Sequence, residues 1–172
     1  MATLADQLER VYSTFVERHG DRALRLAYAT LHDRTEAEDV AQEAFYRLWR
    51  HALRRGAECL SAPLLYQTVV NLCRDRARYR RRHPEDAVDP AELRGSVPAL
   101  GDREQALVVA EAVHALKPIE QQVVLLYYYL DQSLKDTAEI LGLTEQMVKT
   151  RLYRARQHLR PLLESMLREE AR

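Results

Sequence analysis

The 172-residue sequence lacks the features typical of membrane, metal-binding and disulfide-rich secreted proteins. It has no apolar run of the roughly 18 residues that a membrane span requires. Its N-terminus has the periodicity of an amphipathic helix, which differs from the basic-then-apolar pattern of a signal peptide. Its two cysteines, Cys59 and Cys73, do not have the spacing of a metal site. These absences favour a reduced, cytoplasmic chain with no metal or other cofactor.

Signs of catalysis are also missing. The six histidines form no metal-spaced pair, and the five glycines form no phosphate-binding loop. No nucleophile motif is present, and histidines and carboxylates scattered over helices are surface or capping residues by default. We therefore expect that the chain is not an enzyme.

The sequence has no net charge, with 26 basic and 26 acidic residues, but its charges are unevenly distributed. Residues 74–83 contain six arginines and one aspartate, and residues 147–160 contain five basic residues and no acid. Two local basic stripes in a neutral chain indicate two separate anion-binding surfaces. Two solvated helix faces would give the same pattern, and charge alone leaves both interpretations open.

The N-terminal half has apolar residues at helical spacing. This spacing predicts one helix over residues 1–18 and a second over residues 21–31. Thr35 and Glu38 form the Thr-x-x-Glu pattern of a capping box and predict the start of a third helix. The apolar stripe of that helix includes Phe45 and Trp49, and a continuous stripe of this kind has to pack on other helices.

Residues 51–61 lose this periodicity and are expected to form a loop. Ser61 is expected to cap the next helix, which accommodates Pro63 in its first turn and continues to about Arg82. Residues 84–101 then hold three of the six prolines and two of the five glycines, with little apolar material. This composition predicts a flexible, acidic linker.

Helical patterns resume after Asp102, a candidate cap. Helices are expected over residues 103–116, over 119–130 after Pro118, over 134–141 after the cap Ser133, and from residue 145 onward. Pro161 is expected to kink or restart the last helix. The predicted fold class is all-α: two small helical domains, residues 1–83 and 102–172, joined by the linker over residues 84–101.

A helix-turn-helix is predicted within residues 134–153. Ala138 allows close helix approach, Gly142 supplies a left-handed turn, and Thr144 can cap the second helix. The apolar stripe of the second helix, which docks on the first, consists of Val148, Leu152, Ala155 and Leu159. Docking this stripe turns a set of side chains outward for contact with base edges in the major groove: Lys149, Thr150, Tyr153 and Arg154. Arg151 and Arg156 lie on the flanks, where they are better placed for phosphates.

Three segments, residues 33–51, 64–82 and 116–156, occur in an order and spacing that resemble the extracytoplasmic-function group of the bacterial sigma-70 family. Members of this group are the smallest sigma factors and keep only conserved regions 2 and 4. The resemblance covers nearly the whole chain. It implies a sigma factor that binds core RNA polymerase, through its clamp coiled coil and its flap, and recognises the minus-10 and minus-35 promoter elements.

The resemblance also assigns roles to residues. Asp39, Gln42 and Glu43 match the family's grip on the coiled coil of the polymerase clamp. Their spacing makes one polar patch, which we expect opposite the Phe45 and Trp49 stripe. In the family, the loop matching residues 51–62 holds a flipped minus-10 base. The minus-10 contacts then implied are Asn71, Arg74, Arg78, Arg80, Arg81 and Arg82. The minus-35 contacts implied are the six outward and flanking residues from Lys149 to Arg156.

The sequence departs from the family pattern at three places. Leu64 replaces a frequent aromatic residue, Gln67 replaces a basic residue, and Gln146-Met147 replaces a frequent Gly-Thr pair. From Leu64 and Gln67 we expect promoter melting or its sequence preference to differ from the common pattern. From Gln146-Met147 we expect an altered base preference and no loss of the fold. The linker acids match a family segment that enters the polymerase channel, although any polar linker would look similar: Glu85, Asp86, Asp89 and Glu92.

Relatives are commonly held inactive by an anti-sigma factor, which is therefore an expected partner. The main alternative function is a helix-turn-helix regulator that binds DNA as a dimer without polymerase. Another alternative is an interaction protein whose helical hairpin docks on a partner. Binding to core polymerase separates the first interpretation from the other two.

Overall fold

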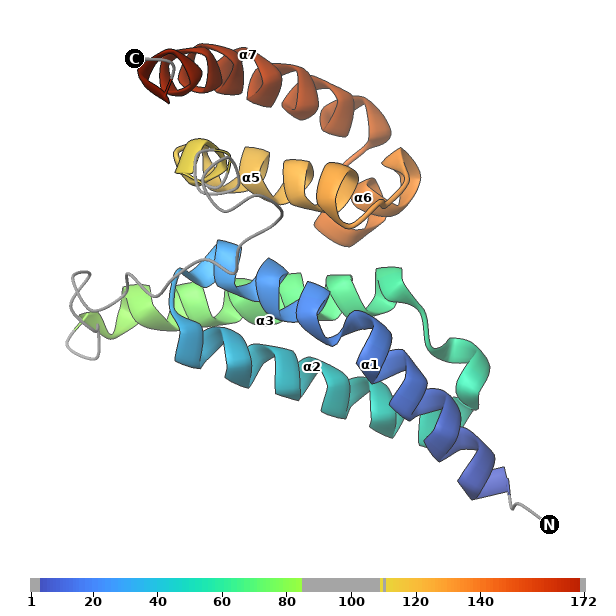
Figure 1. Ribbon diagram of the computed structural model, residues 1–172. Coiled ribbons are helices and arrows are strands. Elements are labelled where there is room, and N and C mark those ends of the chain that lie inside the picture. The colour runs from blue at the N-terminus through green and yellow to red at the C-terminus, as the bar shows by residue number, and fades with distance from the viewer. Residues whose placement is uncertain (1–3, 85–108, 110, 171–172) are drawn as a thin grey trace. The chain divides into compact units, whose positions relative to one another are not determined.

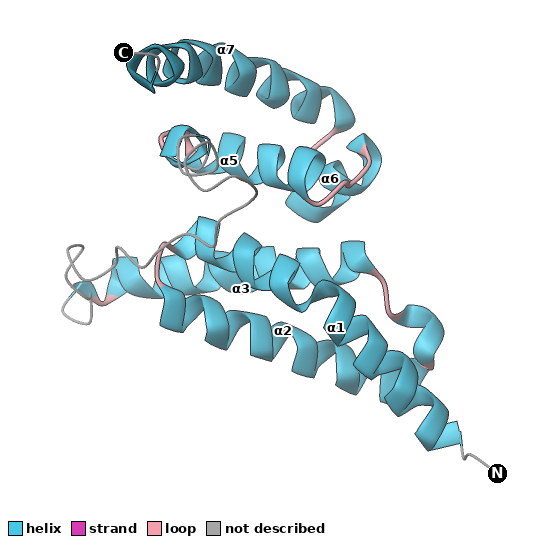
Figure 2. Ribbon diagram, viewed as in Figure 1, coloured by secondary structure: helices cyan, strands magenta, loops and turns pink. Residues whose placement is uncertain are grey.

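The computed structural model describes residues 4–84, 109 and 111–170. The chain forms two compact units, Met1–Arg94 and Gly95–Arg172. Within the described residues every regular element is helical, with no strand (Figures 1 and 2). The all-α fold class with two helical domains is therefore confirmed. Apart from Pro84, the predicted linker lies outside the described residues, as do Asp102 and most of the helix expected over 103–116.

The N-terminal unit is built from three long helices: α1 (Leu4–Leu31), α2 (Arg34–Arg55) and α3 (Ala62–Arg82). A short 3-10 helix, η1 (Ala57–Cys59), lies between α2 and α3. The three long helices pack on one another, and each supplies fully buried side chains to one core (Figure 1). The largest of these are Leu26, Val40, Leu65, Tyr66, Val69 and Val70. Burying one such side chain stabilises the fold by about 1.5–3 kcal/mol.

Helix α1 is continuous, so the prediction of two helices divided near Gly20 is wrong. A glycine inside a helix costs only about 1 kcal/mol relative to alanine. Packing on both sides of Gly20 offsets that cost. On the N-terminal side the Tyr12 hydroxyl donates a hydrogen bond to the Phe45 carbonyl at 2.8 Å, and on the C-terminal side Leu26 is buried.

The start of α2 also differs from the prediction. The cap is Asp33, whose Oδ1 accepts a hydrogen bond from the backbone N–H of Glu36 at 3.0 Å, and Thr35 lies exposed in the first turn. The preceding residue, His32, has a φ of 56°. This left-handed residue ends α1, and Asp33 is the first extended residue after it, in the position that an N-cap requires.

The predicted loop over residues 51–61 is correct only from Gly56 onward, because α2 continues to Arg55. Ala52 is fully buried, and the cationic Arg54 and Arg55 favour the last turn of a helix. Gly56 turns the chain with a φ of 93°, which glycine adopts without strain. The Ser61 cap is confirmed by its hydrogen bond from the Leu64 N–H at 3.4 Å, and proline occupies the first turn of α3.

In the C-terminal unit, residues 111–114 are helical and are followed by α5 (Pro118–Val124). Helix α5 continues directly into the π-helical segment η3 (Leu125–Tyr129). The helix predicted over residues 119–130 is therefore confirmed. Two further helices complete the unit, α6 (Leu134–Leu141) and α7 (Glu145–Glu170). Pro161 lies inside α7, and the helix does not restart there. The largest fully buried side chains are Glu120, Val123, Leu126, Leu130, Ile140 and Leu152.

Candidate protein and nucleic-acid interfaces

A polar groove runs between α2 and α3 and contains the predicted patch. Asp39 and Gln42 are exposed, and Glu43 is half-buried. They line a groove of about 730 Å³, whose other lining residues are Tyr46, Arg47, Leu72, Asp75, Arg76 and Tyr79. Glu43 accepts a hydrogen bond from Nε of Arg47 at 2.7 Å, across an exposed turn of α2. The structure therefore brings the three predicted residues together on one surface.

A second groove, of about 680 Å³, lies between α1 and α2 and is mostly apolar. Tyr12 and Trp49 meet in it with their ring centroids 4.8 Å apart, and Phe45 contributes beside them. Gln42 and Tyr46 line both grooves. The expectation that the polar patch lies opposite the Phe45 and Trp49 stripe is therefore wrong for Gln42, which joins the polar groove to the apolar one.

A basic pocket of about 410 Å³ lies where α2 approaches the start of α3. Asn71 is exposed and lines it, together with Leu64 and Thr68 from the same helix. The other side is formed by side chains of α2, namely Arg47, Leu48, Arg50, His51 and Arg54. Sequence reasoning did not single out these cations as site residues. The signal was their spacing, since positions 47, 50, 51 and 54 share one helix face.

The arginines at the end of α3 do not form one set. Arg78, Arg81 and Arg82 are exposed, and Arg74 is half-buried. Arg80 turns back toward the junction of α1 and α2. Its guanidinium donates to the Leu31 carbonyl at 3.2 Å, to Asp33 Oδ2 at 3.4 Å and to both carboxylate oxygens of Glu36. The structure therefore separates Arg80 from its neighbours in the sequence.

The helix-turn-helix has the predicted local geometry. Ser133 caps α6 by accepting the Asp136 N–H at 2.9 Å, and Gly142 has a φ of 67°. Thr144 accepts the Met147 N–H at 3.1 Å, as expected of a cap for α7. Val148, Leu152 and Ala155 are buried and Leu159 is half-buried, so this stripe faces the core.

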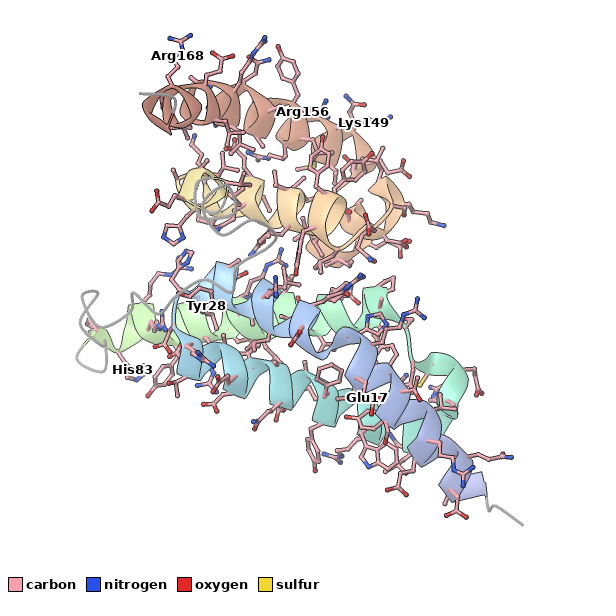
Figure 3. All side chains as sticks on the ribbon, in the orientation of Figure 1. Glu17, Tyr28, His83, Lys149, Arg156 and Arg168 are labelled. Carbon is pink, nitrogen blue, oxygen red and sulfur yellow. The ribbon has the colours of Figure 1, made fainter. Side chains whose placement is uncertain are left out.

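The opposite side of α7 is open to solvent. Lys149, Thr150, Tyr153 and Arg154 are all exposed, as is Arg156, whereas Arg151 is half-buried. Figure 3 shows Lys149 on the side of α7 that points away from α6. Tyr153 is 62% exposed.

Two family models match the chain. "Sigma-70 region 2" covers residues 15–83, and "Sigma-70, region 4" covers residues 106–159. The ECF RNA polymerase sigma factor SigM of Mycobacterium tuberculosis is 32% identical over 157 residues, which are 88% of this chain and 76% of the relative. The chain belongs to the ECF sigma factors. It is thus an RNA polymerase sigma factor of the sigma-70 family, a class of proteins that direct transcription initiation and are not themselves catalysts.

Other relatives of this sigma factor agree. SigW of Bacillus subtilis is 30% identical over 171 residues, which are 90% of each chain. The probable sigma factor RfaY of Xanthomonas campestris is 32% identical, and the chain spans 40% of that relative's length. Among solved structures, CnrH in complex with the cytosolic domain of CnrY superposes with a TM-score of 0.65 at 27% identity, covering 94% of this chain and 96% of that one.

Within the described residues, burial shifts the pKa values of three side chains of this sigma factor, and it raises the pKa of the Tyr12 hydroxyl. Burial lowers the pKa of His19, and the nearby Arg18 and Arg22 lower it further. Burial also raises the pKa of the Cys73 thiol to about 12, with a smaller contribution from Glu36. Across residues 4–84, 109 and 111–170, no helix is long and apolar enough to span a membrane, and no cluster of three potential ligands could hold a metal.

Proposed function

We propose that the sigma factor contacts core polymerase through α2 and contacts the promoter through two basic surfaces, the pocket at Asn71 and the outer face of α7. In this proposal residues 1–83 act as region 2, residues 102–172 act as region 4, and residues 84–101 connect them. The observation that supports it most directly is that Asp39, Gln42 and Glu43, assigned by family resemblance, line one groove, while Asn71 lines a pocket of cations. Because polymerase and promoter are cytoplasmic, we also assign the chain to the cytoplasm.

The polar groove suits a basic helical partner such as the clamp coiled coil. Asp39, Glu43 and Asp75 supply three carboxylates to its lining, against Arg47 and Arg76. Glu43 already pairs with Arg47, but that pair is exposed on both sides and worth only about 0–1 kcal/mol. A lysine or arginine of the partner can therefore displace Arg47 at little cost.

The apolar groove next to it offers the second half of a protein interface. Gln42 and Tyr46 lie on the ridge between the two grooves. A partner that covers the ridge would bury apolar surface on the Trp49 side and form charge pairs on the Asp39 side. This combination of a central aromatic surface and a charged rim is typical of protein interfaces.

The basic pocket suits a base taken out of the DNA stack. Asn71 offers an amide that can both donate and accept hydrogen bonds, and Leu64 offers an apolar wall. Arg50 and Arg54 supply cations for the adjoining phosphates. We propose that they act with Arg74, Arg78, Arg81 and Arg82, whereas Arg80 serves the fold through its ion pairs.

On the outer face of α7 we propose that Lys149, Thr150, Tyr153 and Arg154 contact the minus-35 element, with Arg151 and Arg156 near phosphates.

An anti-sigma partner is also proposed. The supporting observation is that one neighbour of this fold was solved as the sigma factor RpoE in complex with the anti-sigma factor NepR from Bartonella quintana, with a TM-score of 0.64 at 20% identity.

The test of polymerase binding uses two double charge reversals. Asp39→Lys with Glu43→Lys should weaken binding to core polymerase at least about 100-fold, because opposed like charges cost several kcal/mol at an interface. Glu17→Lys with Asp21→Lys is the matched control, since both residues are exposed on α1, line neither groove and change the net charge equally. Promoter-dependent transcription with core polymerase should follow the same order. Equal core affinity for the two double variants contradicts the proposed surface.

A further inference from the structure

The centre of the outward face of α7 contains two residues that family resemblance did not assign to DNA contact. Successive residues of an α-helix are about 100° apart around its axis. On this geometry the buried Val148, Leu152, Ala155 and Leu159 occupy one sector of about 60°. The opposite sector contains Gln146, Thr150, Tyr153 and Gln157, and all four are exposed. Lys149 and Arg154 lie on either side of this sector, some 140° apart.

Position along the helix separates the two glutamines. Gln146 is the second residue of α7, whose start is held by the Thr144 cap. A rise of about 1.5 Å per residue places Tyr153 roughly 10 Å and Gln157 roughly 16 Å beyond Gln146. The major groove is about 12 Å wide, and a recognition helix contacts base edges with its N-terminal residues. The N-terminal turns, from Gln146 to Tyr153, are therefore placed for base edges, whereas Gln157 lies farther along the helix.

The Thr150 hydroxyl is engaged within the helix. Oγ1 of Thr150 donates its hydrogen to the backbone carbonyl of Gln146 at 3.0 Å. The centre of the face has two hydroxyl groups, those of Thr150 and Tyr153, and this bond occupies the hydrogen of the first. A glutamine amide has two donors and an acceptor, and it pairs in a bidentate manner with N6 and N7 of adenine. Gln146 is thus the central side chain equipped for a two-bond contact with one base.

We propose that Gln146 is a specificity-determining residue that selects an adenine in the minus-35 element through its side-chain amide. This inference rests on the proposed function of α7 as the minus-35 contact. Gln146 is a position at which this sequence departs from the family pattern. The proposal therefore adds a contact residue that the family pattern does not contain.

The experiment selects double-stranded DNA from a library randomised over the minus-35 element, with the full chain and without polymerase. The wild type should favour adenine at one position. Gln146→Ala should lower that preference by about 5- to 100-fold and leave the other positions unchanged. Gln146→Arg should move the preference at that position to guanine, because arginine pairs with O6 and N7 of guanine. Gln157→Ala is the matched control and should reproduce the wild-type profile.

Three results overturn the inference: a wild-type profile with no adenine preference, a Gln146→Ala profile identical to the wild type or weaker by the same factor for every sequence, or an equal loss in Gln157→Ala. Circular dichroism of each variant verifies the fold. A parallel transcription assay with core polymerase tests the proposed function separately. If wild-type chain and core give no promoter-dependent transcript, the proposed function fails, and the DNA selection still decides the role of Gln146.

Discussion

Replacing Arg80 by glutamine removes the guanidinium that connects the end of α3 to the junction of α1 and α2. Glutamine is too short to reach both carboxylates and carries no charge. Asp33 and Glu36 would then face each other without their shared cation, and the Leu31 carbonyl would lose a donor. We expect the N-terminal unit to lose stability, with little direct effect on DNA contacts.

The size of the loss follows from the exposure of the three side chains. Arg80 is 31% exposed, Asp33 11% and Glu36 25%, so the cluster is neither a surface pair nor a buried one. Exposed pairs contribute about 0–1 kcal/mol. Removing one partner of a fully buried pair costs about 3–5 kcal/mol. An intermediate value of about 2 kcal/mol is therefore expected for the free energy of unfolding.

Tryptophan fluorescence makes this measurement specific to one unit, because Trp49 is the single tryptophan of the chain and lies on α2. With an m-value of about 1 kcal/mol/M in urea, a loss of 2 kcal/mol lowers the unfolding midpoint by about 2 M. Arg82→Gln, at an exposed position two residues away, is the control and should stay within about 0.5 kcal/mol of the wild type. Equal midpoints for the two variants, with DNA affinity lost only in Arg80→Gln, would refute the structural role of Arg80.

Two further predictions concern the interior of the same unit. The pKa of His19 is lowered in the fold, so the unfolded chain binds a proton at His19 more readily than the folded chain does. The contribution of His19 to the free energy of unfolding is therefore complete above about pH 6.5 and is lost as the pH falls below that value. The urea midpoint should thus decrease between pH 7.5 and 5, with a smaller slope in His19→Gln, and equal slopes would count against this explanation. Because the pKa of Cys73 is about 12 and its side chain is buried, iodoacetamide at pH 8 should label Cys59 alone until urea is added. If mass spectrometry shows both thiols labelled in the native state, this prediction is contradicted.

The parts of the fold that follow from local chemistry could be predicted from the sequence. As expected, two residues cap helices by accepting a backbone N–H, Ser133 and Thr144, and Gly142 turns the chain between the helices. The apolar stripe from Val148 to Leu159 likewise follows from helical spacing alone. These features depend on neighbours in the sequence and need no knowledge of the tertiary structure.

The errors occur where two local options compete, and in every case except the first, distant residues decide between them. Thr35 is a good cap in isolation, but the left-handed His32 places Asp33 at the helix start. Gly20 is a common helix end, but packing of α1 on its neighbours keeps the helix continuous. Arg80 resembles the arginines around it until the fold brings Glu36 within reach, 44 residues earlier in the sequence. The basic pocket at Asn71 similarly requires α2 and α3 to meet before its cations share one site.

The two oxygens of the Asp33 carboxylate have different partners, and this has a consequence for local unfolding. Oδ1 accepts the Glu36 N–H in the first turn of α2, and Oδ2 accepts from the Arg80 guanidinium near the end of α3. Fraying of the last turn of α3 therefore removes a support from the first turn of α2. Helix α2, which lines both grooves proposed for polymerase, and helix α3, which bears the arginines, are coupled at these ends and should open as one cooperative unit in hydrogen exchange. A single carboxylate thereby links the order of the two surfaces.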